Sequence, residues 1–188
     1  TGFDCECSLA NSAAIISNPE AHRDYVRPGI MLYGSSPMAE KVGAEFGLKP
    51  LMRLKSAVIA VNTIKAGLSV GYGATWTAER DTNLAVVAIG YGDGYPRHAK
   101  TGTPVVVNGK RTRIIGRVSM DMLAVDLTEI EDANVGAHVE LWGATLLASE
   151  VAPWCDTIPY TLFTGITRRV HKAYKNIHEA NPDLKKAC

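Results

Sequence analysis

The feature that most constrains the fold is a series of short β-rich runs at close intervals, which begins near residue 51. Residues 54–64 alternate between apolar and polar side chains, and residues 84–91 are apolar throughout, like a strand buried on both faces. Further along stands Asn108-Gly109, a two-residue hairpin signal whose central residues both need positive φ. Close strands joined by tight turns are typical of a small barrel or sandwich.

Other segments predict the elements around these strands. We expect strands over residues 122–127 and 138–143, and helical segments over 147–157 and 160–166. A last strand is expected over residues 168–174. The first 40 residues have a different sequence pattern. They predict the end of a strand, a helix capped near Asn11 or Ser12, and a second strand over 26–34 closed by Gly34. Residues 37–50 are expected to be a connector, because Gly and Pro interrupt them.

Charge and length exclude several classes of protein. The chain has 20 Lys and Arg against 19 Asp and Glu, without a basic cluster, so we expect no nucleic-acid or membrane partner. Its apolar stretches are too short to span a bilayer. Four cysteines without metal-type spacing predict free thiols, no metal and a cytoplasmic location. A complete (β/α)8 barrel of about 250 residues does not fit in 188.

Six segments carry more specific information because of their order and spacing. They are LANSAA (9–14), VRPGIMLYG (26–34), VGYGATW (70–76), IGYGDGYPR (89–97), GRVSMDM (116–122) and IPYTL (158–162). Together they resemble the pyridoxal-phosphate-dependent alanine racemases. The resemblance covers roughly residues 5–175 and matches only the C-terminal half of the family's chain.

The resemblance implies a mainly β fold, with a small C-terminal β barrel or sandwich domain and short helices. An α/β remnant of a (β/α)8 barrel would precede this domain. We therefore expect residues 1–45 to hold the barrel remnant and the connector, 46–178 the C-terminal β domain, and 179–188 a frayed tail. In the first 40 residues an apolar face would be left uncovered, which predicts that the chain self-associates or that this segment rearranges.

Tyr72 in VGYGATW matches the family's catalytic tyrosine, which moves the α-proton on the face opposite the cofactor lysine. Racemisation with two bases needs a proton acceptor on each face of a planar carbanion. A free phenol is mostly protonated at neutral pH, so we expect cations near it in the assembled site. Without the motif, Tyr72 would be read as an aromatic at a strand end.

Arg27 matches the residue that faces the pyridine nitrogen of the cofactor. A guanidinium there should leave this nitrogen unprotonated, which makes the electron sink shallower than an acidic partner would. Many family members have a histidine supporting this arginine where the present chain has Ser8. Taken alone, Arg27 would be interpreted as an arginine at a strand end that forms an ion pair on the surface.

Four residues match positions that hold the cofactor phosphate, through hydroxyl groups and backbone N–H groups: Ser12, Gly29, Ile30 and Tyr160. Donors of this kind suit a dianion without requiring lysines. Taken alone, Ser12 would be read as a helix N-cap and Tyr160 as a core residue.

Met120 matches the residue whose backbone N–H receives the substrate carboxylate. Asp93 and Asp121 are expected to hold loops by pairing with nearby arginines. The positions that line the approach to the site match Tyr91, Arg97 and Arg117. Cations there would favour an amino-acid carboxylate.

The resemblance implies interconversion of L- and D-alanine, supplying D-alanine for peptidoglycan, in a homodimer that binds pyridoxal phosphate. The family's Schiff-base lysine lies in a motif like KANAYGHG, and none of the ten lysines here lies in such a motif. We therefore expect this lysine to lie outside the chain, and the chain alone to be inactive.

Three alternatives remain open. A broad-specificity racemase of the same family has the same motifs. A basic amino-acid decarboxylase is less consistent, because those enzymes present a reactive cysteine where this chain has Tyr72. A β module that binds a protein or nucleic acid would instead show exposed aromatics interleaved with Lys and Arg.

Overall fold

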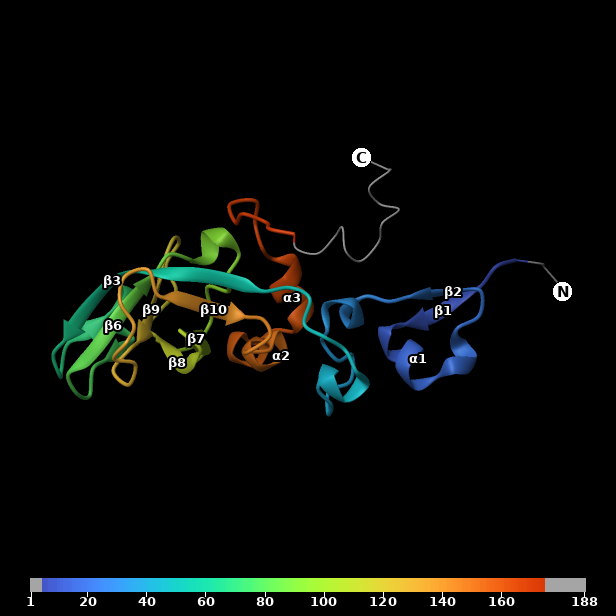
Figure 1. The fold of residues 1–188 in the computed structure, drawn as a ribbon, viewed down its shortest axis with the longest axis horizontal. Coiled ribbons are helices and arrows are strands. Elements are labelled where there is room, and N and C mark those ends of the chain that lie inside the picture. The colour runs from blue at the N-terminus through green and yellow to red at the C-terminus, as the bar shows by residue number, and fades with distance from the viewer. Residues whose placement is uncertain (1–4, 175–188) are drawn as a thin grey trace.

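A computed structural model describes residues 5–174. At one end of the elongated molecule lie β1 (Ser8–Asn11), α1 (Ser12–Ser17) and β2 (Tyr25–Arg27), with β1 and β2 parallel (Figure 1). Asn11 caps α1, since its side chain accepts the Ala14 N–H at 3.0 Å. This α/β piece confirms the predicted strand, helix and strand order.

The β domain is a closed antiparallel barrel in the order β10-β3-β6-β9-β8-β7 (Figure 1). Its strands are β3 (Leu54–Ile64), β6 (Thr82–Val87), β7 (Pro104–Val107), β8 (Lys110–Ile115), β9 (Leu123–Asp126) and β10 (His138–Trp142). A separate two-stranded ribbon joins β4 (Ser69–Val70) to β5 (Trp76–Thr77). Two short helices, α2 (Ala148–Val151) and α3 (Pro159–Thr164), follow the barrel. The expected mainly β class with short helices is confirmed.

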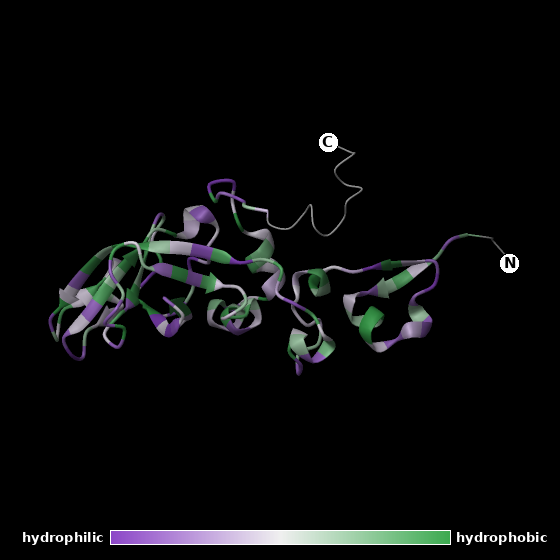
Figure 2. Ribbon diagram, in the orientation of Figure 1, coloured by the Kyte–Doolittle hydropathy of each residue, from purple (hydrophilic) through white to green (hydrophobic). Residues whose placement is uncertain are grey.

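Apolar side chains, which alternate with polar ones along the strands, fill the barrel interior. Apolar and polar residues succeed one another along the strands (Figure 2), and the inward set includes Val105, Ile114 and Leu141, all fully buried. Asn108 and Gly109 both have positive φ, of 47° and 81°, as a tight hairpin between β7 and β8 requires. Closure of the barrel leaves these strands without an edge open to other chains.

Three local predictions are wrong. The second strand ends at Arg27 rather than near Gly34, because Pro28 has no N–H to donate and Ile30–Tyr33 forms a 3₁₀ turn. The strand expected over 84–91 ends at Val87, and residues 168–174 form no strand, since the closed barrel offers them no partner. The tail expected at 179–188 lies outside the described residues. Within them, no helix has the length and apolar character needed to cross a membrane.

Candidate functional site

Residues from three distant segments meet around Gly29. Ser12, buried at the start of α1, accepts the Gly29 N–H on its Oγ at 2.8 Å. A Cβ built at Gly29 would lie 3.8 Å from Ser12 Oγ and 4.0 Å from Tyr160 Cε1 of α3. The N-cap reading of Ser12 is wrong, because Asn11 caps the helix. Tyr160 is 46% exposed and is not a core residue.

The donors around this glycine fit a phosphate group. Ser12 Oγ accepts a backbone N–H, so its own proton is free to be donated elsewhere. Ile30 begins the 3₁₀ turn, and its N–H therefore lies outside the hydrogen bonds within that turn. Hydroxyl and amide donors around a residue without a side chain can accommodate a small anion such as a phosphate group. We call Ser12, Gly29, Ile30 and Tyr160 the cradle.

Arg27 is held beside the cradle by β1. Its Nη1 donates to the carbonyl oxygen of Ser8 at 2.6 Å and to the Ser8 hydroxyl at 2.7 Å. The serine that stands in place of the family's histidine therefore contacts the arginine directly. Arg27 forms no ion pair with any residue of the described part of the chain, so its charge is available to a ligand.

Tyr72 lies on the turn between β4 and β5 and is 73% exposed. Gly71 has φ of 79°, and a Cβ built there would lie 3.5 Å from the Arg117 backbone N. A Cβ at Gly73 would lie 3.8 Å from Arg117 Nη1. The turn thus packs on the 116–122 loop, and the Arg117 guanidinium lies close to the glycine that follows Tyr72. The predicted cations beside the phenol itself remain a prediction.

The 116–122 loop is joined in turn to the 88–103 loop. Gly92 N–H donates to the Met120 carbonyl at 2.8 Å, and Tyr91 N–H to the Ser119 carbonyl at 3.0 Å. The Arg97 guanidinium lies over the Tyr91 ring, 5.8 Å from its centroid. We call Tyr72, Tyr91, Arg97, Arg117 and Met120 the barrel-end group.

Asp93 and Asp121 do hold loops, but not through the expected arginines. Both carboxylates pair with Arg169, at 3.2 Å for Asp93 Oδ1 and through a short contact for Asp121. Arg169 was not predicted from the sequence, because it lies 48 positions from Asp121 in a segment expected to be a strand. No local sequence pattern predicts an ion pair between residues so far apart in the chain.

The structure forms the cradle and the barrel-end group as two separate sets. Between them, no hydrogen bond or ion pair is found within residues 5–174. Helix α3 contacts the surroundings of both, since Tyr160 adjoins Gly29 while a Cβ at Gly94 would lie 2.1 Å from the Gly165 carbonyl oxygen.

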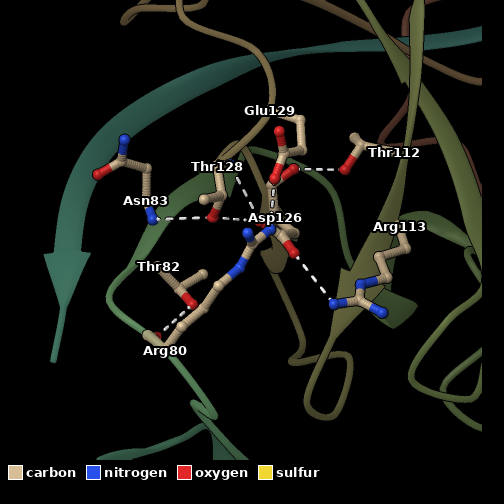
Figure 3. Close-up of polar contacts among 8 residues, drawn as sticks. All are labelled: Arg80, Thr82, Asn83, Thr112, Arg113, Asp126, Thr128 and Glu129. Atoms are coloured by element: carbon tan, nitrogen blue, oxygen red, sulfur yellow. Dashed lines mark hydrogen bonds and ion pairs between the residues drawn. The ribbon is translucent and has the colours of Figure 1, made fainter. Parts of the chain in front are cut away.

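A second polar cluster, on the barrel wall, has a structural role. Asp126 accepts hydrogen bonds from Thr128 Oγ1 at 2.7 Å and Arg113 Nη2 at 3.2 Å, while Arg80 pairs with Glu129 (Figure 3). Burial raises the pKa of Asp126, but these hydrogen bonds and the Arg113 charge outweigh it and bring the pKa below its ordinary value. The positive charges here are balanced by acids.

The described residues form a closed antiparallel β-barrel domain joined to a small α/β piece. Residues 51–174 match the family model of the alanine racemase C-terminal domain, and residues 2–37 match that of the alanine racemase N-terminal domain. The chain belongs to the alanine racemase family.

Individual relatives agree with this assignment. The chain is 59% identical to the alanine racemase of Hahella chejuensis, over 92% of its own length and 46% of the relative's. The crystal structure of the biosynthetic alanine racemase from Pseudomonas aeruginosa has a TM-score of 0.89 and 54% identity, covering 93% of this chain and 48% of that one. The alanine racemase from Bartonella henselae, solved with covalently bound pyridoxal phosphate, has a TM-score of 0.83 and 33% identity, covering 92% of this chain and 48% of that one. The chain thus spans about half the length of the relatives it matches.

Proposed function

We propose that the chain is the C-terminal part of an alanine racemase that interconverts L- and D-alanine with pyridoxal phosphate, in the cytoplasm. The observation that carries the proposal is the cradle, in which Ser12 and Tyr160 meet at Gly29 from segments far apart in the sequence. The family assignment supports the same conclusion.

In this proposal the cradle binds the cofactor phosphate. The Ser12 and Tyr160 hydroxyls and the Ile30 N–H would donate to its oxygens, and Gly29 leaves room for it. The Gly29 N–H orients the Ser12 hydroxyl by donating to its oxygen. Pyridoxal phosphate, when bound, withdraws electrons from the substrate and so makes the α-proton more acidic.

Arg27 would face the pyridine nitrogen of the bound cofactor and would leave it unprotonated, because a guanidinium does not readily give up a proton. Ser8 fixes one Nη group through two hydrogen bonds, which limits the side-chain rotation that would turn the guanidinium away. A weaker electron sink suits a racemase, since the α-proton must return quickly and side reactions must be avoided.

Tyr72 moves the α-proton on one face, and a lysine outside this chain moves it on the other. Tyr72 acts as a general acid or base in this proposal, and the Arg117 guanidinium lies close to the neighbouring Gly73. Met120 N–H binds the substrate carboxylate, while Tyr91 and Arg97 line the approach.

A homodimer explains the separation of the two sets. Because the cradle and the barrel-end group do not meet within one chain, we propose that the barrel-end group of one copy completes the cradle of a second copy. The chain alone is then inactive, since it supplies one base without the lysine.

A hybrid protein tests the proposal. The N-terminal part of the Pseudomonas aeruginosa enzyme is joined to this chain, and racemisation of alanine, serine and lysine is measured for the hybrid and for the chain alone. We expect alanine turnover by the hybrid only. Tyr72→Phe should lower kcat about 100-fold or more, as loss of a general acid or base does. Turnover by the chain alone, or full activity of the Phe variant, would contradict the proposal, and equal rates on all three amino acids would favour the broad-specificity alternative.

A further inference from the structure

Arg169 joins the two loops that carry most of the barrel-end group. Its Nε contacts Asp93 Oδ1 at 3.2 Å in the 88–103 loop, and its Nη2 contacts Asp121 Oδ1 in the 116–122 loop. Asp121 follows Met120 directly in the sequence. A single guanidinium from the segment after α3 therefore bridges two carboxylates that lie 28 positions apart (121 − 93).

The surrounding backbone is built around this guanidinium. A Cβ at Gly92 would lie 2.2 Å from Arg169 Nη1 and 3.1 Å from the Met120 carbonyl oxygen, so a side chain there would displace the guanidinium from this position. Asp93 uses its other carboxylate oxygen to accept the Gly90 N–H at 2.9 Å. One carboxylate thus fixes the start of its own loop while it binds Arg169.

A third connection anchors the arginine's own segment. Thr167 N–H donates to the Asp93 carbonyl at 3.0 Å, and Thr167 Oγ1 donates to the Gly92 carbonyl at 2.9 Å. The two carboxylates contact different nitrogens of the guanidinium, Nε and Nη2, an arrangement that the single nitrogen of an ammonium group cannot reproduce. Arg169 is 45% exposed, so these contacts serve to fix geometry more than to add stability.

We propose that Arg169 is a positioning residue for substrate binding. By holding Asp93 and Asp121 together, it fixes the loop that carries Met120 and so directs the Met120 N–H toward the substrate carboxylate. This inference rests on the proposed function for the carboxylate, but the restraint on the loops is independent of it. Arg168 is the matched control, because it is an exposed arginine in the same segment for which no ion pair is found among residues 5–174.

The first experiment uses the 188-residue chain. Amide hydrogen exchange is followed by NMR at Tyr91 and Gly92, whose N–H groups bind the 116–122 loop. We expect Arg169→Met to accelerate exchange at both amides about tenfold or more, while the amides of β3 and β6 keep their rates. Arg168→Met should leave all of these rates unchanged. Unchanged exchange at Tyr91 and Gly92 in Arg169→Met would overturn the proposal.

The second experiment uses the hybrid racemase. Arg169→Met should raise KM for alanine and the inhibition constant of propionate, a carboxylate without an amine, each by about tenfold, with kcat within about threefold of the unsubstituted hybrid. Arg169→Lys should recover only part of this loss. A fall in kcat at unchanged KM, or the same effect from Arg168→Met, would overturn the positioning role. A hybrid that is inactive with Arg169 intact would count against the proposed function, and the exchange rates would then decide separately whether Arg169 restrains the loops.

Discussion

Arg27 Nη1 donates hydrogen bonds to both the carbonyl oxygen and the hydroxyl of Ser8, at 2.6 and 2.7 Å. The two residues come from neighbouring parallel strands, so the guanidinium is tied to the strand that leads into the cradle. The resemblance implied a histidine beside this arginine in many family members, where the present chain has Ser8. The serine is short, yet it contacts the arginine without an intermediate.

This contact predicts the effect of Ser8→Ala in the hybrid racemase. The variant removes one hydrogen bond, worth about 0.5–1.5 kcal/mol, and keeps the one to the Ser8 carbonyl. We expect kcat to fall about two- to tenfold and the visible absorption of bound pyridoxal phosphate to shift, because the partner of its ring nitrogen is less firmly held. Ser17→Ala is the control, since that hydroxyl binds only the Ala13 carbonyl of its own helix. Equal effects of the two substitutions would contradict a specific role of Ser8.

Asp126 predicts how the stability of the chain depends on pH. Its pKa lies below the ordinary value in the folded state, so its stabilising effect is complete above the unfolded pKa of about 3.9 and is lost as pH falls through the folded pKa. Asp126→Asn should lower the free energy of unfolding by about 1 kcal/mol at pH 7. This estimate is below the usual contribution of a hydrogen bond to a charged group, because Arg113 is 57% exposed and solvent weakens its attraction to the carboxylate. The difference between the two proteins should shrink below about pH 4. Urea unfolding between pH 7 and 3 measures this, and a difference independent of pH would contradict it.

Two glycines with similar backbone angles predict different costs of substitution. Gly94 and Gly136 have φ of 99° and 89°, but a Cβ at Gly94 would lie 2.1 Å from the Gly165 carbonyl oxygen, whereas one at Gly136 would meet nothing within 4 Å. Gly136→Ala should therefore lower the free energy of unfolding by about 1–2 kcal/mol, from backbone strain alone. Gly94→Ala should cost at least about 2 kcal/mol more, because the 88–103 loop and α3 must separate. Thermal unfolding of both variants measures these costs. Equal losses of stability in the two variants would show that Gly94 and the Gly165 carbonyl oxygen do not lie this close together in solution.

The sequence predicted the elements with local signals and missed those that long-range contacts decide. The strand over 54–64 and the Asn108-Gly109 turn follow from alternation and from the need for positive φ, and both are found. Arg169 was missed because its partners lie in loops that only the closed barrel brings near it. The family motifs pointed to the cradle residues, whereas their meeting at Gly29 depends on how α3 docks.

The docking of α3 gives the last prediction. The rings of Tyr33, at the end of the 3₁₀ turn that follows the cradle, and Phe163, in α3, are stacked with centroids 5.2 Å apart and planes at 20°. Because Phe163 and Tyr160 lie on the same helix, this stack holds the Tyr160 ring beside Gly29.

Phe163→Ala should therefore weaken binding of pyridoxal phosphate to the hybrid by up to about tenfold, since an aromatic pair contributes about 0.5–1.5 kcal/mol beyond its buried area. Phe46→Ala is the matched control, because Phe46 is also half-buried but contacts Lys41 in the connector. Cofactor fluorescence titration gives both affinities. If the two variants bind the cofactor equally well, the Tyr33–Phe163 stack does not position Tyr160, and the cradle must be held together by the Ser12–Gly29 hydrogen bond alone.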